Sequence, residues 1–179
     1  MTAVTDTVAD TIAAPLTARI KLATTSAERD AARALRRQVF CVEQGLFGGD
    51  DTDTIDRTAL TLVAVDGDGA VIGTVRIHHA GDNVWWGSRL AVARPARRQA
   101  AVGSGLIKLA VGAARALGCT TFMAHVQQQN VAMFAQLHWQ ALAEIALHGR
   151  PHSLMRADFA AYPPIRDADQ GFVCTRSVA

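Results

Sequence analysis

The chain has 179 residues, half of them hydrophobic, with 18 basic and 16 acidic side chains and a formal net charge of +2. This length predicts one globular domain with a substantial core, and the near balance of charge argues against a protein that acts on nucleic acid or on anionic membranes. No stretch reaches the roughly 18 uncharged apolar residues of a membrane span, and three widely spaced cysteines without a secretory signal indicate free thiols in a reducing cytoplasm.

The chain is expected to begin with a leader, a strand and a helix. Residues 1–18 are predicted to be a disordered leader, because they are rich in Thr and Ala and lack both a basic start and an unbroken apolar run. A short strand follows at residues 19–23. The capping box Thr25-x-x-Glu28 then opens a helix that runs to about Glu43. The apolar stripe of this helix consists of Ala31, Leu35, Val39 and Val42.

An acidic loop is predicted at residues 45–57. It does not match a calcium loop of the hand type, because that pattern needs an oxygen ligand and a glycine at the places held by Ile55 and Asp56. We therefore expect a solvated acidic loop, or an acidic rim that attracts a cationic amine. The acidic residues concerned are Asp50, Asp51, Asp53 and Asp56.

Three antiparallel strands are predicted next. Residues 59–65 and 70–78 have the composition of strands, and Asp66-Gly67-Asp68-Gly69 between them is a strong hairpin signal. A third strand is expected at residues 84–92. Together they predict an antiparallel meander.

The second half is predicted to alternate helices and strands. Apolar residues at helical spacing predict a helix over residues 102–117 that ends before Gly118. The strand at 120–126 follows it as the parallel partner of the strand at 84–92. Asn130 is expected to cap a further short helix. The remaining predictions are strands at 141–147 and 153–159 and an irregular tail at 165–179.

The start of the helix at 102–117 has the features of a phosphate cradle. The first N–H groups of a helix lack partners and carry a positive partial charge, so small residues there let a pyrophosphate approach the backbone. Gly103 and Gly105 supply this clearance, and three upstream arginines can bond further phosphates. These arginines are Arg94, Arg97 and Arg98. The implied ligand is a nucleotide-like cofactor.

Two other glycine-rich phosphate sites are excluded by their patterns. A dinucleotide-binding turn needs a third glycine after the pair Gly103 and Gly105, where Lys108 stands. A P-loop needs Gly-Lys followed by Ser or Thr, and this sequence is absent from the region.

The predicted α/β fold, a mixed sheet of six to seven strands over residues 19–164 with helices on both faces, resembles the GNAT superfamily of acetyl-CoA-dependent N-acetyltransferases. The family's cradle pattern, Q/R-x-x-G-x-G/A, is matched at 98–103, with Ala101 in place of the first glycine. Leu90-Ala91-Val92 matches the strand whose backbone bonds the pantetheine arm. The resemblance implies acetyl-CoA as the cofactor. The residues implied to contact it are Leu90, Ala91, Val92, Arg97, Arg98, Gln99, Ala100, Ala101, Val102, Gly103, Ser104, Gly105, Asn130 and Phe134.

The first third of the chain resembles one branch of this family more closely. The segments at 36–44, 51–56 and 73–77 look like those of ElaA-like proteins and, more distantly, of acyl-homoserine-lactone synthases. The segments at 126–131 and 149–152 are similar to the bacterial group called nitrogen-starvation N-acetyltransferases. The resemblance covers residues 19–164.

Two positions depart from the family pattern. Phe134 stands where a tyrosine commonly protonates the departing thiolate, and Tyr162, the only tyrosine, lies near the end of the chain. A thiol with a pKa of about 8.5 leaves at neutral pH at a cost of roughly 2 kcal/mol, which a water or another acid can offset. His138 replaces a glycine that is usual in the family.

Acetyl transfer to an amine also needs a base, because a lysine-like amine has a pKa of about 10.4. Glu43, at the end of the first helix, and His125, on the strand at 120–126, are the predicted catalytic residues. A solvated helix-end charge is an equal alternative for Glu43. A hydrogen-bonded structural role is favoured for His125 by its alternation with apolar neighbours. Of His78 and His79, only one can face the cleft.

The predicted acceptor site draws on the antiparallel strands. Arg76 and Arg89 on neighbouring strands can hold a substrate carboxylate, although pairing with the loop aspartates is an equal alternative. Trp85 and Trp86 point to opposite faces, so that one belongs to the core and the other to the cleft. The residues assigned to the acceptor are Arg76, His78, Trp85 and Arg89.

The sequence thus predicts an N-acetyltransferase in which an amine attacks the thioester directly, with backbone N–H groups near Ala91 and Val92 polarising the carbonyl. The acceptor is expected to be a small-molecule or peptide amine, with no nucleic acid, membrane or metal involved, and a homodimer is left open. Two alternatives stay open as well: a non-catalytic acyl-CoA-binding regulatory module, and a synthase-like transfer from a longer acyl donor.

Overall fold

Eight strands form one sheet in this computed structural model, which describes residues 17–175. The strands are β1 (Ala18–Leu22), β2 (Leu60–Asp66), β3 (Val71–Gly81), β4 (Val84–Val92), β5 (Thr121–Gln127), β6 (Trp139–Leu147), β7 (Arg150–Ala157) and β8 (Phe172–Cys174). The helices are α1 (Ser26–Arg37), α2 (Ala100–Ala116) and α3 (Val131–Gln136). No helix in this part of the chain is both long and apolar enough to cross a lipid bilayer.

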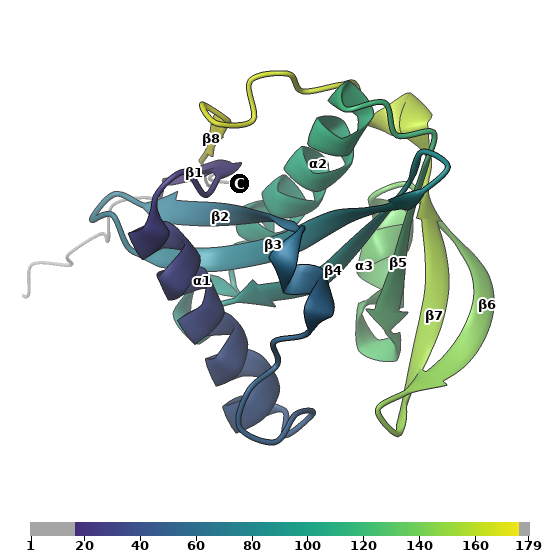
Figure 1. Cartoon of the computed structure of the whole chain (residues 1–179), viewed down its shortest axis with the longest axis horizontal. Helices are drawn as coiled ribbons and strands as arrows, with labels where there is room; N and C mark the ends of the chain where they lie inside the picture. The colour runs from purple at the N-terminus through teal and green to yellow at the C-terminus, as the bar shows by residue number, and fades with distance from the viewer. Residues whose placement is uncertain (1–16, 176–179) are drawn as a thin grey trace, which may run out of the picture.

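The strands lie in the order β6-β7-β5-β4-β3-β2-β1-β8 (Figure 1). Neighbours are antiparallel except for β4 and β5, which confirms the predicted parallel crossover through α2. The mixed sheet is confirmed, but it has eight strands where the sequence predicts six to seven. The additional strand, β8, lies in the predicted irregular tail and pairs with β1. Its three residues are too few to produce a periodic signal. Residues 1–16 of the predicted leader lie outside the described residues, and Ala18 already belongs to β1.

Alternating residues of the central strands supply two separate cores. On β2, Leu62 and Ala64 join the large cluster that packs around α2, whereas Val63 packs with Ala32 of α1. The two helices therefore cover opposite faces of the sheet, as Figure 1 shows. Helices on both faces are thereby confirmed.

The predicted capping box forms at the start of α1. Thr25 Oγ1 accepts from the Glu28 N–H at 3.1 Å, and the Glu28 carboxylate accepts from the Thr25 N–H at 3.2 Å. Burial alone would raise the pKa of Glu28, but hydrogen bonds from Lys21 and two backbone N–H groups lower it to about 2. The helix continues as a π-helical turn, Gln38–Glu43, which confirms its predicted end. Val42 leaves the predicted apolar stripe and is 67% exposed, because the π turn changes the helical repeat.

Three arginines and three aspartates fasten the loop after α1 to the sheet. Arg36 of α1 lies in the centre, with its Nε 2.8 Å from Asp51 Oδ2 and its Nη1 2.6 Å from Asp56 Oδ1. Only 2% of Arg36 is exposed. Burial opposes the charge on Asp56, but hydrogen bonds from Arg36 hold its pKa well below the usual range. The arginine–aspartate network consists of Arg36, Arg76, Arg89, Asp51, Asp53 and Asp56.

Removing one member of this network leaves buried charges with fewer partners. We expect Arg36→Ala to lower the free energy of unfolding by about 3–5 kcal/mol, because Asp51 and Asp56 lose the buried counter-charge that they share and keep only Arg89 and Arg76. Arg33→Ala is the matched control: Arg33 lies on the same helix, its side chain is 58% exposed, and it pairs only loosely with Asp30 at 3.7 Å. Its loss is expected to cost less than about 0.5 kcal/mol. Urea denaturation measures both; equal losses would contradict the assignment.

Candidate active site

The central feature of the site is a gap between β4 and β5. The two strands pair only where Val84–Gly87 meets Thr121–Ala124, and beyond these residues β4 stays with β3 while β5 stays with β7. The pairing of β3 with β4 shifts so that Arg89 and Leu90 form a bulge, and Arg89 has a φ of 55°. A bulge bends its strand, and here it accompanies the parting of β4 from β5. The sheet opens into a V.

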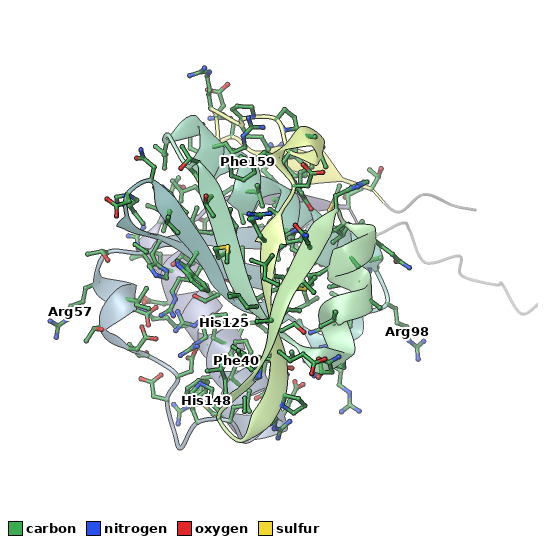
Figure 2. The ribbon with its side chains drawn as sticks, turned by 90° about the vertical axis from the view of Figure 1, so that its right-hand side faces the viewer. Phe40, Arg57, Arg98, His125, His148 and Phe159 are labelled. Atoms are coloured by element: carbon green, nitrogen blue, oxygen red, sulfur yellow. The ribbon has the colours of Figure 1, made fainter. Side chains whose placement is uncertain are left out.

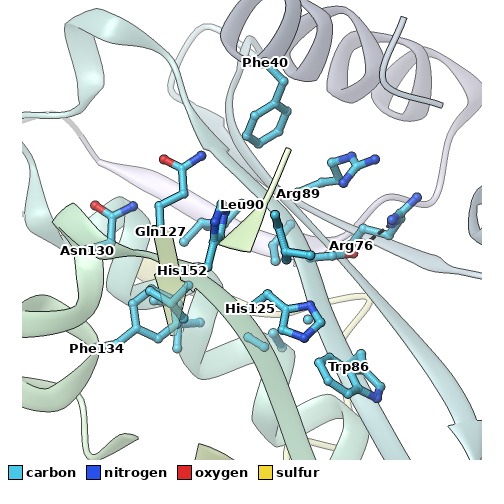
Figure 3. Close-up of a pocket in the computed structure, with 18 of the residues that line it drawn as sticks. Phe40, Arg76, Trp86, Arg89, Leu90, His125, Gln127, Asn130, Phe134 and His152 are labelled. Atoms are coloured by element: carbon cyan, nitrogen blue, oxygen red, sulfur yellow. Dashed lines mark hydrogen bonds between the residues drawn. The ribbon is translucent and has the colours of Figure 1, made fainter. Parts of the chain in front are cut away.

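A cavity of about 460 Å³ occupies this gap. Figure 2 shows that Phe40, His125 and His148, which come from three distant segments, gather at one side of the molecule. Figure 3 shows the cavity from within, with Trp86 and His125 opposite Asn130 and Phe134. The wall on the α2 side is apolar, whereas the α1 side carries histidines and amides. Apolar members of the lining are Ile107, Ala110, Phe122, Phe134 and Trp139.

α2 begins eight residues after the end of β4, and its start lacks a side-chain cap. The N-cap residue Gln99 makes no capping hydrogen bond, so the first N–H groups have no side-chain partner. A Cβ on Gly103 would meet nothing within 4 Å, which leaves open space beside the helix start. Gly105 is different: a Cβ there would lie 3.1 Å from Ile20 Cγ1, so this glycine permits close packing of the helix on β1 rather than access of a ligand. Val102 likewise faces the core, with 1% exposure.

The other predicted cofactor residues divide between the cavity and its surroundings. Leu90, Asn130 and Phe134 line the cavity. Ala91 packs into the core below α1, and Ser104 donates its hydroxyl to the Ala100 carbonyl at 2.8 Å. Arg98 points into solvent (Figure 2).

Glu43 is not placed as a base. Its carboxylate accepts from Arg97 Nη2 at 2.6 Å, and it is absent from the cavity lining. Arg97 also donates through Nε to the Val92 carbonyl at 2.9 Å, so it ties the end of the first helix to the end of β4. In this structure Glu43 and Arg97 bind each other, and their predicted roles as base and phosphate ligand stay predictions.

His125 and His78 both reach the cavity. The His125 ring lies 4.7 Å from the Trp86 ring and has no hydrogen-bond partner among the described residues, so the hydrogen-bonded structural role does not apply. Burial, and secondarily the neighbouring His152, lower the pKa of His125. Burial, followed by the charge of Arg76, lowers the pKa of His78, whose buried Nδ1 has no partner. Both rings are thereby kept neutral near pH 7.

The prediction that Trp85, and not Trp86, belongs to the acceptor site is wrong. Trp85 is 9% exposed and belongs to the core around α2, with His79 beside it at 5.5 Å. Trp86 and His78 face the cavity instead. Strand alternation predicts that the two tryptophans separate, but not which of them faces the core.

Arg76 is not available to a substrate carboxylate. It is 2% exposed, and its donors go to Asp53, Asp56 and Ser88, which satisfies the guanidinium within the protein. Arg89 donates through Nε and Nη2 to Asp51 and Asp53 and stacks over the Phe47 ring at 4.4 Å. The alternative of pairing with the loop aspartates is the one realised.

Two further observations concern the acidic loop. Most of its carboxylates are neutralised by arginines, so the loop does not form a free acidic rim. Within residues 17–175, no group of three or more His, Cys, Asp or Glu side chains is placed to hold a metal ion.

Several cavity residues are missing from the site that the sequence predicts. His152 lines the cavity from β7, and Gln127 donates to the Gln44 side chain at 2.9 Å across it. Phe40 comes from the π turn after α1. These residues are far apart in the chain, and only their pairing within the sheet brings them together.

Comparison with known families supplies the classification. A sequence model described as the acetyltransferase (GNAT) family matches residues 34–139, more than half of the chain. The chain belongs to the GNAT family. No curated protein matches it by sequence.

Solved structures of GNAT-like proteins share the fold at low identity. A candidate N-acetyltransferase from Lactobacillus plantarum is 23% identical, with a TM-score of 0.70, over 78% of this chain and 97% of that one. Escherichia coli ElaA is 18% identical, with a TM-score of 0.67, over 79% and 98%. BjaI, a CoA-dependent acyl-homoserine lactone synthase solved with SAM and isopentyl-CoA, is 15% identical, with a TM-score of 0.67, over 80% and 85%. At these identities the likeness concerns the fold alone.

The structure explains one departure from the GNAT pattern. His138 has a φ of 63°, in the left-handed region that glycine adopts most readily. The position lies between α3 and β6, so the usual glycine has a conformational reason, and His138 takes the same conformation.

Phe134 is 6% exposed and packs edge-on against Trp139 at 5.0 Å. Tyr162 does not replace the missing hydroxyl, because it is buried and bonded to Trp139 and the Leu137 carbonyl.

The lowered pKa of His78 predicts a pH-dependent stability. The unfolded chain, with a histidine pKa of 6.5, binds a proton as the pH falls below that value, while the folded chain resists protonation. The free energy of unfolding therefore falls as the pH decreases from about 7.5 to about 5. His78→Gln should weaken this decrease, measured by denaturation at both pH values. An unchanged pH dependence in His78→Gln would contradict the lowered pKa.

Proposed function

We propose that this GNAT protein transfers an acyl group from an acyl-CoA, acetyl-CoA first of all, to an amine. The observation that carries the proposal is the V-shaped gap between β4 and β5, which holds a cavity, together with the uncapped start of α2 eight residues after the end of β4. A long thin ligand with a diphosphate at one end and a thioester at the other fits this arrangement. The open space beside Gly103 supports the same orientation.

The chain's own groups divide the work of binding. N–H groups at the start of α2 would hold the diphosphate, because no side chain caps them and they carry the positive end of the helix dipole. Leu90 and Asn130 would contact the arm inside the cavity. Bound acetyl-CoA supplies an activated thioester. Backbone N–H groups at Ala91 and Val92 would polarise its carbonyl.

His125 is the base that this geometry favours over Glu43. It lies on the α1 side of the cavity, is neutral because burial lowers its pKa, and has a free ring nitrogen in the absence of a hydrogen-bond partner among residues 17–175. Trp86 beside it offers a flat apolar wall for the acceptor. His125 would take the proton that the amine loses as it attacks.

A longer acyl donor is a second candidate, because the α2 side of the cavity is apolar. Phe122, Phe134 and Trp139 leave no polar group there that an alkyl chain would have to displace. BjaI and ElaA share only the fold with this chain, so the longer donor and the ElaA-like branch both stay proposals. Comparing the affinities of acetyl-CoA and a long-chain acyl-CoA separates the two donors.

Gly103 tests the binding mode directly. Gly103→Glu should fold, because a side chain there meets open space, but should lose at least about tenfold in acetyl-CoA affinity through repulsion of the phosphates. Gly103→Gln has the same bulk without the charge and should lose less. Calorimetry of acetyl-CoA binding measures both variants, and equal affinity of Gly103→Glu and wild type would contradict the proposed cradle.

His125 tests catalysis. His125→Gln should lower the rate of amine acetylation by about 10²–10⁴-fold while acetyl-CoA affinity is retained. His79→Gln is the control, since His79 lies on β3 outside the cavity lining and should keep full activity. A panel of small and peptide amines provides the assay. Tight binding of acetyl-CoA without turnover on any amine would favour a regulatory module instead.

A further inference from the structure

Breaking the thioester requires a proton for the sulfur, because a thiol of pKa about 8.5 leaves poorly as a thiolate at neutral pH. The side chain of Phe134 cannot supply one. Apart from two arginines held in the arginine–aspartate network, few titratable side chains line the cavity. They are Asp53, His78, His125, His148 and His152.

Four of these five side chains are less suited to protonate the sulfur, because each is ion-paired, exposed or beside Trp86. Asp53 is held by two arginines of the arginine–aspartate network. His148 is exposed at the turn between β6 and β7 and packs against the Phe47 ring at 4.7 Å. His78 and His125 lie on either side of Trp86, on the α1 side of the cavity where the amine would enter.

His152 differs from the others because its ring is fixed. It is 6% exposed, and its Nδ1 lies 2.9 Å from the Arg150 carbonyl oxygen. A carbonyl can only accept, so Nδ1 carries a hydrogen, and a proton bound at Nε2 is the one that the ring can release into the cavity. The ring lines the cavity from β7, opposite Gln127 of β5 in the register of the sheet. Figure 3 shows it between Phe134 and His125.

We propose that His152 protonates the departing sulfur in the acyl transfer. This rests on the function proposed above. The amine nitrogen forms a bond to the acyl carbon, the carbon–sulfur bond breaks, and the electron pair of that bond takes the proton from His152 Nε2. His125 takes the proton that the nitrogen loses. Exchange with water in the open cavity returns both rings to their starting states, so no net proton is gained or lost.

The surroundings of His152 allow it to act as the acid while His125 acts as the base. The titratable group that faces it from β5 is His125, while β6 places Ile145 opposite it, and Arg150 lies on its own strand. Because two like charges at short range repel, protonation of one ring opposes protonation of the other. One histidine can therefore hold a proton while its neighbour stays neutral and basic.

Variants of His152 should separate chemistry from binding. His152→Gln is expected to lower kcat by about 10²-fold or more, with KM and Kd for acetyl-CoA changed less than about twofold. Added imidazole should restore part of the activity of His152→Ala by entering the space left by the ring. His138→Gln, at an exposed position outside the cavity, is the control and should behave as wild type. Circular dichroism confirms folding of each variant.

A second measurement does not depend on turnover. With CoA bound to the wild type, a protonated His152 beside the sulfur favours the thiolate, whose ultraviolet absorbance differs from that of the thiol. The thiolate fraction of bound CoA should therefore be higher in wild type than in His152→Gln at the same pH.

The possible outcomes distinguish failure of the proposed role of His152 from failure of the proposed function. If the wild type binds CoA and acetylates an amine, but His152→Gln has the same kcat and the same thiolate fraction, His152 is not the acid and the proposed function stands. If the wild type fails to bind CoA in calorimetry, the proposed function falls and the role of His152 falls with it.

Discussion

The site depends on one constraint, the failure of β4 and β5 to stay together. A parallel pair that ran its full length would satisfy the backbone of both strands and leave no room between them. Here the bulge at Arg89 accompanies the departure of β4, and each strand keeps an antiparallel partner on its other side. The gap therefore opens inside a sheet that remains stable, and backbone groups that would have paired are left for a ligand.

The arginine–aspartate network holds one wall of this gap in place. Burying ion pairs costs desolvation and contributes little net stability, but breaking them is expensive, so the network specifies one arrangement of the acidic loop. Arg89 links the network to the bulge, and the same residue stacks on Phe47 at the mouth of the cavity. A loop that the sequence shows only as acidic thus becomes a rigid part of the site.

The chemistry of the site comes from histidines on three strands. Desolvation lowers the pKa of His78 and of His125, while a backbone carbonyl fixes the ring of His152. The other side of the cavity is an apolar wall. This separation of a polar side and an apolar side suits a reaction between an amine and an acyl thioester.

Local patterns in the sequence determined most of the elements, because capping, hairpin turns and helical spacing act between residues close in the chain. They also determined that small residues open α2. Tertiary structure alone decided which of two adjacent tryptophans faces the cavity, that Gly105 serves packing, that Glu43 is bound by Arg97, and that His152 joins the site. The physical reason is that strand register and the parting of two strands join residues distant in sequence, and no local spacing encodes that.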